Sequence, residues 1–590
     1  MSRFGNRPIL LFLLMLMVGC KTGNFTEDTA GHSAQTNLMN NDATSSNSDS
    51  ISRADSAQSA VNTPNVEKSD SISSSEFPPG ATTTFSIDTS NQNHSISPYI
   101  YGLNTVKDGR PRGIRFARQG GNRLSAYNWE NNASNAGTDW YNQNDNLLGS
   151  SNSPGKYTVD FIKNAFSHGG AALVTVPMLG YVAADKSPQG DVNQTPDYLK
   201  KRFYISKARK GAPLLMTPVV NDQFVYQDEY VNFLEKMFPD ARAKSSTELF
   251  YSLDNEPGLW ASTHPRLRGD ASGDQGQQVT YAELMEKTID YASTIKSIAP
   301  DAKIFGPALY GYTAFVNLQY APDANGRDFI EFYLQQLAKA EKKKGKRLVD
   351  VLDIHWYPEV SVPTIGKIMS ADNVNPVLVK ERIQAPRSLW DKDYIERSWI
   401  SQNYLHGPIA LLPDLQSKID KYYPGTRIAI TEYYYGGGND ISGAIAQADV
   451  LGILGRENVF AANLWKMGDT MQDFVWGAFE MYTSFNAKGD KFGDISIAAT
   501  NADAENYSIY AALDSTDPGR MTIMLINKAE NAVQAGVDIA HGMKFRAADI
   551  YQLTASDSKP KKAGVLDISD ENTFKYVMPE RSVSLLVLSI

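Results

Sequence analysis

The run Leu249-Phe-Tyr-Ser-Leu-Asp-Asn-Glu-Pro257 has the form of a buried β-strand that ends abruptly in polar residues. Its first five residues are mostly apolar or aromatic, and Pro257 cannot continue a ladder of hydrogen bonds. Seven similar runs alternate with stretches of helical periodicity along the chain. They are 99–104, 114–120, 171–177, 303–307, 351–356, 427–432 and 459–464. Strands alternating with helices predict a parallel α/β fold, and eight such units predict a (β/α)8 TIM barrel.

Helical periodicity between these strands is clearest over 230–237, 281–298, 329–344, 412–422 and 444–454. Two connections, 180–224 and 358–404, are much longer than the others, and we expect them to be insertions on the catalytic rim of the barrel.

From about Gly477 the pattern changes to short strand-like runs separated by turns. These runs are 495–499, 507–512, 521–527, 534–539, 545–553, 574–578 and 582–590. They predict an additional antiparallel β-sandwich domain. The run 82–88, upstream of the barrel, could add one strand to it. We therefore expect residues 81–98 to contribute an N-terminal strand to the sandwich, 99–477 to form the barrel and 478–590 to form the rest of the sandwich.

The composition supports a large folded core and excludes several classes of protein. The 590 residues include 42% hydrophobic and 21% charged residues, which rules out wholesale disorder. Acidic residues (66) outnumber basic ones (57), so the chain lacks the basic footprint of a nucleic-acid-binding protein. A single cysteine excludes an intrachain disulfide and Cys-rich metal sites.

The first 20 residues have the form of an export signal. Arg3 and Arg7 precede an apolar run over 9–18 that is too short to span a bilayer. It ends Met17-Val18-Gly19-Cys20, which resembles a bacterial lipoprotein signal, in which cleavage before the cysteine is followed by its acylation. We therefore expect residues 1–19 to be a signal peptide and Cys20 to carry the lipid. The alternative is an ordinary secretory signal with an incidental cysteine.

The residues after Cys20 indicate where such a protein would be held. Lys21 stands where an Asp would favour retention in the inner membrane, so the resemblance favours lipid anchoring to the outer membrane or cell surface of a bacterium. The 56 residues from Lys21 to Glu76 contain 13 Ser and one aromatic residue. Such a composition cannot bury enough apolar surface to fold, so we expect 20–80 to be a lipid-anchored linker.

Two glutamates end strand-like runs in the same way. Glu256 follows the fourth predicted strand and Glu432 ends the seventh, so both should reach the carboxyl rim of the barrel, where barrel enzymes keep their catalytic groups. Cleavage of a glycosidic bond needs such a pair, one carboxyl protonated to donate to the leaving oxygen and one ionised to attack or stabilise the anomeric carbon. Asn255 could bind the sugar 2-hydroxyl.

Five sequence blocks resemble glycoside hydrolase family 44, the endo-β-1,4-glucanases and xyloglucanases. They lie within 118–140, 251–265, 353–358, 430–449 and 461–465. The resemblance implies a barrel plus a sandwich and a retaining mechanism, with Glu256 as the acid/base and Glu432 as the nucleophile. It implies no cofactor for catalysis. Members of the family can carry a structural metal ion, but no clear ligand cluster in the sequence places one.

Further residues near the predicted rim could bind substrate or adjust the glutamates. Arg118 and Asn122 flank a Gly-Gly turn after the second strand, and either could contact the nucleophile or the sugar. His355 and Tyr357 end the sixth strand and could hydrogen-bond a carboxylate and shift its pKa. Indole rings suit the faces of pyranose rings. The candidates are Trp129, Trp140, Trp260, Trp356 and Trp465, of which Trp129 and Trp465 are the preferred sugar contacts.

The sequence thus predicts a monomeric, extracytoplasmic hydrolase that acts on a polysaccharide and meets the membrane only through its lipid. Two alternatives stay open. One is a hydrolase for another β-glycan, such as xylan or mannan. The other is a glycan-binding lipoprotein without catalysis, although a binding surface would not need the acid pair.

Overall fold

A computed structural model of the chain describes residues 78, 80–91, 93–104, 110–220, 222–243, 247–370, 372–467, 471–568 and 572–590. The predicted signal peptide, Cys20 and the linker up to residue 77 lie outside the described residues. Among the helices that are described, none combines the length and the apolar character that crossing a bilayer requires.

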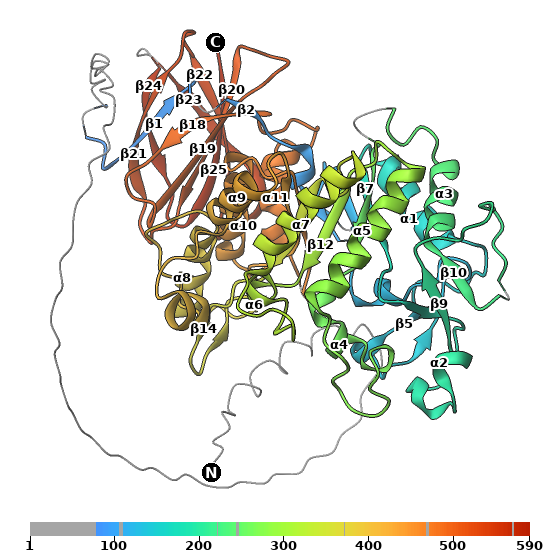
Figure 1. Cartoon of the computed structure of the whole chain (residues 1–590). Coiled ribbons are helices and arrows are strands. Elements are labelled where there is room, and N and C mark those ends of the chain that lie inside the picture. The colour runs from blue at the N-terminus through green and yellow to red at the C-terminus, as the bar shows by residue number, and fades with distance from the viewer. Residues whose placement is uncertain are drawn as a thin grey trace, which may run out of the picture. The chain divides into compact units, whose positions relative to one another are not determined.

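Eight parallel strands close into a barrel in the order in which they occur along the chain (Figure 1). They are β3 (Gly102–Leu103), β4 (Phe116–Gln119), β7 (Ala171–Val176), β11 (Leu249–Leu253), β12 (Ile304–Leu309), β13 (Val351–Trp356), β16 (Arg427–Tyr433) and β17 (Ala461–Leu464). Each lies within or overlaps one of the eight predicted runs, so the predicted barrel is confirmed. The first strand is shorter than expected, because residues 98–100 form a 3-10 turn.

Aromatic rings fill the end of the barrel where the strands begin. Tyr99, Phe116, Phe250, Phe305 and Phe460 pack together in a buried cluster. The ring centroids of Tyr99 and Phe250 are 5.3 Å apart, and those of Phe250 and Phe305 are 5.5 Å apart. This apolar plug closes one end of the barrel, so the polar residues of the interior are left at the carboxyl ends of the strands.

The outer helices include α1 (Lys156–Ser167), α3 (Gln227–Met237), α5 (Tyr281–Ile298), α7 (Phe329–Lys344), α9 (Leu411–Tyr422), α10 (Ile441–Arg456) and α11 (Asp473–Thr483). Local sequence sets where they begin. The side chain of Thr280 accepts a hydrogen bond from the Glu283 amide at the start of α5, and Asp328 accepts one from Glu331 at the start of α7. Both are N-caps followed three residues later by Glu.

The two long connections carry short elements on the carboxyl side of the barrel. Residues 180–224 form β8 (Tyr181–Ala183), α2 (Tyr198–Lys201), β9 (Phe203–Lys207) and β10 (Phe224–Tyr226). Residues 358–404 include β14 (Ser361–Val362), β15 (Gly366–Lys367) and α8 (Pro376–Gln384). The short rim helices α4 (Trp260–Thr263) and α6 (Tyr312–Asn317) follow β11 and β12, and in Figure 1 they lie below the barrel strand β12.

The C-terminal region forms a separate, mostly antiparallel sheet with its own core. Its strands are β18 (Ile495–Thr500), β19 (Tyr507–Leu513), β20 (Arg520–Asn527), β21 (Val533–Ala540), β22 (Ala547–Thr554), β23 (Asp557–Asp567), β24 (Thr573–Met578) and β25 (Ser582–Ser589). The upstream run joins them as β1 (Thr83–Asp88), as predicted, and β2 (His94–Ser95) pairs with β18. One pairing is parallel, that of β1 with β21.

Two details of this region differ from the sequence analysis. Strand β23 was not predicted, because it lies at an edge of the sheet, is largely exposed and has no apolar alternation. The expected boundary at Gly477 falls inside helix α11. This helix packs on α10 of the barrel and on β23 of the sandwich, so a boundary at Gly477 would cut through it.

A buried polar contact fastens the barrel to the sandwich. Asp449 of α10 lies 2.8 Å from the ammonium group of Lys528 and accepts a hydrogen bond of 2.7 Å from the Tyr510 hydroxyl. Gly452, one turn later, leaves room for the Tyr510 ring, because a Cβ there would lie 2.1 Å from it. The barrel and the sandwich are therefore joined directly at this buried contact.

Candidate active site

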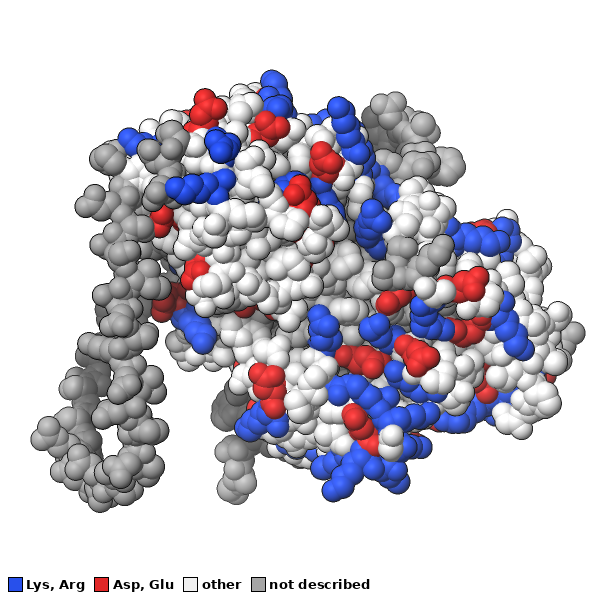
Figure 2. Space-filling model, turned by 90° about the horizontal axis from the view of Figure 1, so that it is seen from above, with Lys and Arg blue, Asp and Glu red and all other residues white. Residues whose placement is uncertain are grey.

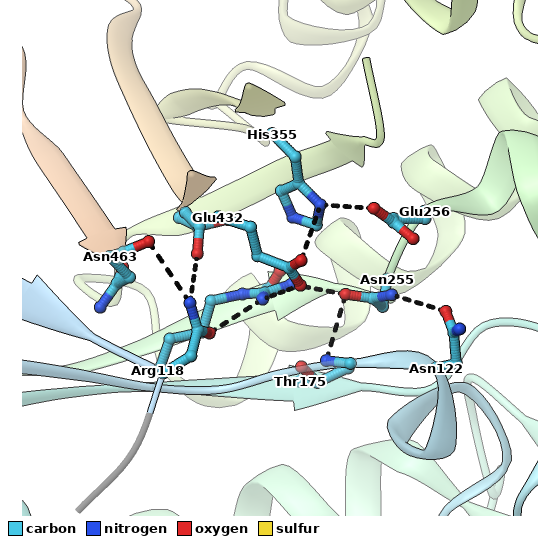
Figure 3. Close-up of polar contacts among 12 residues, drawn as sticks. Arg118, Asn122, Thr175, Asn255, Glu256, His355, Glu432 and Asn463 are labelled. Carbon is cyan, nitrogen blue, oxygen red and sulfur yellow. Dashed lines mark hydrogen bonds and ion pairs between the residues drawn. The ribbon is translucent and has the colours of Figure 1, made fainter. Parts of the chain in front are cut away.

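The two glutamates meet at the carboxyl end of the barrel, with a histidine between them (Figure 3). Glu256 follows β11, Glu432 lies in β16, and His355 lies in β13. One carboxylate oxygen of each glutamate and a ring nitrogen of His355 all lie within 4.8 Å of one another. The two glutamates are separated by 175 residues in the sequence, yet they lie next to each other in one small site.

Glu432 is held by groups that stabilise negative charge. Its Oε1 accepts a hydrogen bond of 2.7 Å from Nη1 of Arg118, whose side chain is completely buried. Its Oε2 accepts one of 2.9 Å from the hydroxyl of Tyr357. Burial, followed by the charge of Glu432, raises the pKa of Tyr357 well above its usual range, so this hydroxyl keeps its proton and donates.

Glu256 has a different environment. It lies in the left-handed region of the backbone, with a φ of 45°, and its amide donates to the carbonyl of Ala308. Burial raises the pKa of the Glu256 carboxyl to about 7, and the charge of Arg118 only partly opposes this effect. The carboxyl therefore holds a proton in weakly acidic solution.

His355 joins the two carboxyls without adding a charge. Its Nδ1 is 2.8 Å from Oε1 of Glu256 and 3.6 Å from Oε2 of Glu432. Burial lowers the pKa of His355 to about 3, so the ring is neutral at ordinary pH. Its contact with Glu256 is thus a hydrogen bond and not an ion pair, and it fixes the orientation of the Glu256 carboxyl.

A chain of amide groups links Arg118 to the loop after β4. Nη2 of Arg118 donates to Oδ1 of Asn255 (2.7 Å), and Nδ2 of Asn255 donates to Oδ1 of Asn122 (3.2 Å). Asn122 in turn donates to the carboxylate of Asp139. The structure therefore brings the predicted residues Arg118, Asn122 and Asn255 together, with Arg118 on the nucleophile candidate and Asn122 one contact further away.

Two residues of this site were missed in the sequence analysis. Asp254 is completely buried and accepts hydrogen bonds from the Ser125 hydroxyl, the Trp260 indole and the amides of Met178, Leu179 and Asn255. Asn104 accepts one from Arg118. The signal for Asp254 was its position directly before Asn-Glu-Pro, at the point where the strand ends. Asn104 has a weaker signal, because it is one polar residue at the end of the first predicted strand, beside the strand that carries Arg118.

The tryptophans divide into core and surface residues. The expected sugar contact at Trp129 is wrong, since this side chain has no exposed surface and packs on Tyr230, with ring centroids 5.6 Å apart. Trp260 and Trp356 are buried as well. Trp465 is partly exposed and lies over Gly121, where a Cβ would be 2.8 Å from the indole. Trp140 is 38% exposed.

A second group of exposed aromatic rings lies on the rim insertions. Trp399 and Tyr404 are 40% and 51% exposed, and both pack edge-on against Tyr312 of α6. Trp399 and Tyr404 were not among the predicted sugar contacts, because the long connection 358–404 has no strand or helix pattern that would place them beside α6.

Glu256, His355 and Glu432 also form the single group in the described ranges that offers three close metal ligands. Arg118 and Tyr357 already donate to Glu432, and the guanidinium supplies the positive charge that this carboxylate needs. We therefore assign no structural metal ion to these residues.

At the rim of this barrel a carboxyl with a raised pKa, Glu256, lies close to a carboxylate paired with Arg118, Glu432. This is the arrangement expected of a glycoside hydrolase. Comparison with known proteins gives the family. The model of glycoside hydrolase family 44 matches residues 133–360. Endoglucanase A of Paenibacillus lautus is 38% identical over 519 residues, which cover 86% of this chain and 72% of that protein. The chain belongs to glycoside hydrolase family 44.

Two solved structures are similar over the same part of the chain. Cel44A, the family 44 endoglucanase of Clostridium thermocellum, is 38% identical with a TM-score of 0.79 and is covered completely. A family 44 xyloglucanase of Paenibacillus polymyxa, solved with xyloglucan, is 36% identical with a TM-score of 0.79, and 99% of it is covered. Each matches 86% of this chain.

Proposed function

We propose that the protein is a retaining endo-β-1,4-glucanase that cleaves cellulose-type glucan or xyloglucan by double displacement. The spacing of the two carboxyls carries this proposal, because one oxygen of each lies within 4.8 Å of one oxygen of the other. This is closer to the separation of about 5–5.5 Å in retaining enzymes than to the about 6.5–9.5 Å of inverting ones. The endoglucanase and xyloglucanase relatives support the choice of substrate.

In the first step Glu432 attacks the anomeric carbon while Glu256 gives its proton to the leaving oxygen. The unequal surroundings support this division of roles. Glu256 is the carboxyl whose pKa burial raises to about 7, and Glu432 is the one that Arg118 and Tyr357 hold. In the second step Glu256 takes a proton from water, which attacks the glycosyl-enzyme and releases Glu432.

Sugar rings would lie across the rim, where partly exposed aromatic side chains are available. Trp140 and Trp465 follow β4 and β17, and Trp399 and Tyr404 lie on the insertion after β13. Aromatic faces along such a rim would hold a chain at several sugars, which suits cleavage within a polymer.

The test is chemical rescue of the nucleophile. Glu432→Gly should be almost inactive on a soluble β-glucan, and azide should restore turnover and give a glycosyl azide of inverted configuration. Product from the unaltered enzyme, followed by NMR from the first turnover, should retain its configuration. Rescue at Glu256→Gly but not at Glu432→Gly would exchange the two roles, and an inverted product from the unaltered enzyme would exclude the mechanism.

A substrate panel tests the specificity separately. We expect release of oligosaccharides from carboxymethylcellulose, xyloglucan or mixed-linkage glucan in preference to xylan and mannan. Preferential cleavage of xylan or mannan would contradict the choice of substrate and leave the mechanism intact, whereas glycan binding without any product would contradict catalysis.

We also propose that the enzyme is a monomer, needs no cofactor and is anchored outside the cytoplasm through a lipid on Cys20. The support for the lipid anchor is the signal-like sequence before Cys20. Expression with labelled palmitate should label the unaltered chain and not Cys20→Ala, and label retained by Cys20→Ala would exclude this anchor.

A further inference from the structure

The end of helix α7 and the residues after it carry five exposed lysines: Lys339, Lys342, Lys343, Lys344 and Lys346. Within the part of the chain that the structure describes, none of the five forms an ion pair. Neighbouring cations differ, since Arg347 lies 3.8 Å from Glu341 and Lys303 lies 3.3 Å from Glu248. We call these five residues the lysine patch. It is a local excess of positive charge on a chain whose net charge is −9.

The position of the lysine patch follows from the barrel topology. Helix α7 returns from the rim to the start of β13, so its last turn lies at the amino ends of the strands. His355 of the active site is four residues into β13, about 13 Å further along the strand direction. The patch and the catalytic glutamates are therefore at opposite ends of the barrel. Figure 2 looks onto the end away from the rim and shows Lys and Arg side chains interspersed with Asp and Glu.

Stabilisation of the helix accounts for only part of this charge. Cations in the last turn interact favourably with the helix dipole, but this effect is confined to that turn. Lys346 lies beyond Gly345, which ends the helix with a φ of 71°. The remaining charge is free to act on an external surface, where about four or more clustered basic residues bind anionic lipids.

The entry point of the chain is compatible with such a surface. Residues 21–76 connect the described structure to Cys20, and the chain first enters the fold at β1 of the sandwich. In Figure 1 the sandwich lies at the top, on the side away from α4, α6 and β14 of the rim. A surface that meets the lysine patch would therefore leave the active site uncovered.

We propose that the lysine patch docks the enzyme on a lipid surface that carries anionic phosphate headgroups, with the catalytic rim facing away from that surface. This orientation complements the proposed lipid on Cys20, and it presents the carboxyl pair to polysaccharide that cannot pass the envelope. The docking is electrostatic and is therefore weakened by salt.

The test compares two variants of the full chain that lose the same charge. In one, Lys342, Lys343, Lys344 and Lys346 become Gln, which keeps the helix propensity. In the control, four exposed lysines on the rim insertions, Lys200, Lys201, Lys207 and Lys392, become Gln. The N-terminal segment is the same in both, so any difference in sedimentation with vesicles reports the patch.

We expect the unaltered chain and the control to bind phosphatidylglycerol vesicles at low salt at least tenfold more tightly than the patch variant. Vesicles of phosphatidylcholine alone, or half-molar salt, should remove the difference. Equal binding by the two variants, or a larger loss in the control, would overturn the proposal. Hydrolysis of soluble glucan should be unchanged in the patch variant, so a failure of docking is distinct from a failure of the proposed catalysis.

Discussion

The ends of β11 and β16 carry the same chemical group in opposite electrostatic settings. Glu432 is a member of its strand and receives hydrogen bonds from Arg118 and Tyr357. Glu256 stands just past its strand in a left-handed conformation, and among the described residues its side chain hydrogen-bonds to the neutral ring of His355. Arg118 donates to one carboxyl and not to the other, while burial raises the pKa of Glu256, so two carboxyls less than 5 Å apart have different surroundings.

The largest effect should come from removing Glu432. Glu432→Gly should lower kcat by about 10⁵-fold or more, as expected when a covalent nucleophile is lost. Glu256→Gln should cost about 10²–10⁴-fold, the usual contribution of general acid–base catalysis. An aryl cellobioside makes the comparison sharper, because its phenolate leaves without protonation. The first step on this substrate should survive Glu256→Gln but not Glu432→Gly. Equal losses on both substrates would contradict the assigned roles.

The pH dependence should follow the same division. Because the acid must be protonated in the first step, kcat/KM should fall as pH rises through about 7, the pKa to which burial raises Glu256. Glu256→Gln should lose this alkaline limb. His355 is neutral throughout this range, so a conservative variant, His355→Gln, should keep the limb near the same pH. If the alkaline limb disappeared in His355→Gln, it would report the titration of His355 and not that of Glu256.

Arg118→Met removes the difference between the two settings while keeping most of the side chain's volume. It leaves the buried carboxylate of Glu432 without its counter-charge, so kcat/KM should fall by about 10²–10³-fold. Arg115→Met, at an exposed arginine just before β4, is the control and should leave kcat/KM unchanged. An unchanged kcat/KM in the Arg118 variant would show that this guanidinium does not support Glu432 in catalysis.

A smaller effect is expected from Asp254→Asn. The Asp254 carboxylate accepts from side chains and amides on both of its oxygens, whereas an Asn amide can accept on only one. The Asn-Glu turn would lose part of its support, and kcat should fall about tenfold to a hundredfold with little change in KM. Asp254→Glu at the same expression level should not restore activity, because the extra methylene displaces the turn. A change in KM alone would instead indicate a role in binding substrate.

The smallest effect concerns stability. The raised pKa of Glu256 means that the folded state favours the protonated form, so the contribution of this group to stability is complete below about pH 4.5 and is lost as pH rises through about 7. Glu256→Gln avoids the ionised form, and its unfolding free energy should exceed that of the parent by up to about 3 kcal/mol at pH 8. At pH 4 the two should be nearly equal. An identical pH dependence of Tm in both proteins would show that the Glu256 carboxyl is not desolvated.

Much of the fold could be predicted because its barrel strands can be recognised from short local sequence patterns. The run before Asp254 and the run before Glu432 are both apolar, short and ended by polar residues, and both proved to be barrel strands. The edge strand β23 could not be predicted in this way, since it is largely exposed and has no apolar alternation. The predicted boundary at Gly477 fell inside helix α11, because the helix continues past the point where we placed the change of pattern.

The site shows the same limit. Trp129 occurs in a block beside the rim, and no local feature distinguishes an indole that stacks on Tyr230 from one that faces solvent. Trp399 and Tyr404 lie in a connection without regular pattern, and only the fold places them beside Tyr312.

The sequence by itself determined the alternation of strands and helices, the closure of eight units into a barrel and the presence of two glutamates at its rim. These features follow from local burial patterns and from the residues that end each strand. Only the tertiary structure decided which glutamate receives Arg118, which tryptophans are covered, and that the lysine patch faces away from the catalytic end. Such properties depend on contacts between residues far apart in the chain, and electrostatic setting and exposure are set by those contacts alone.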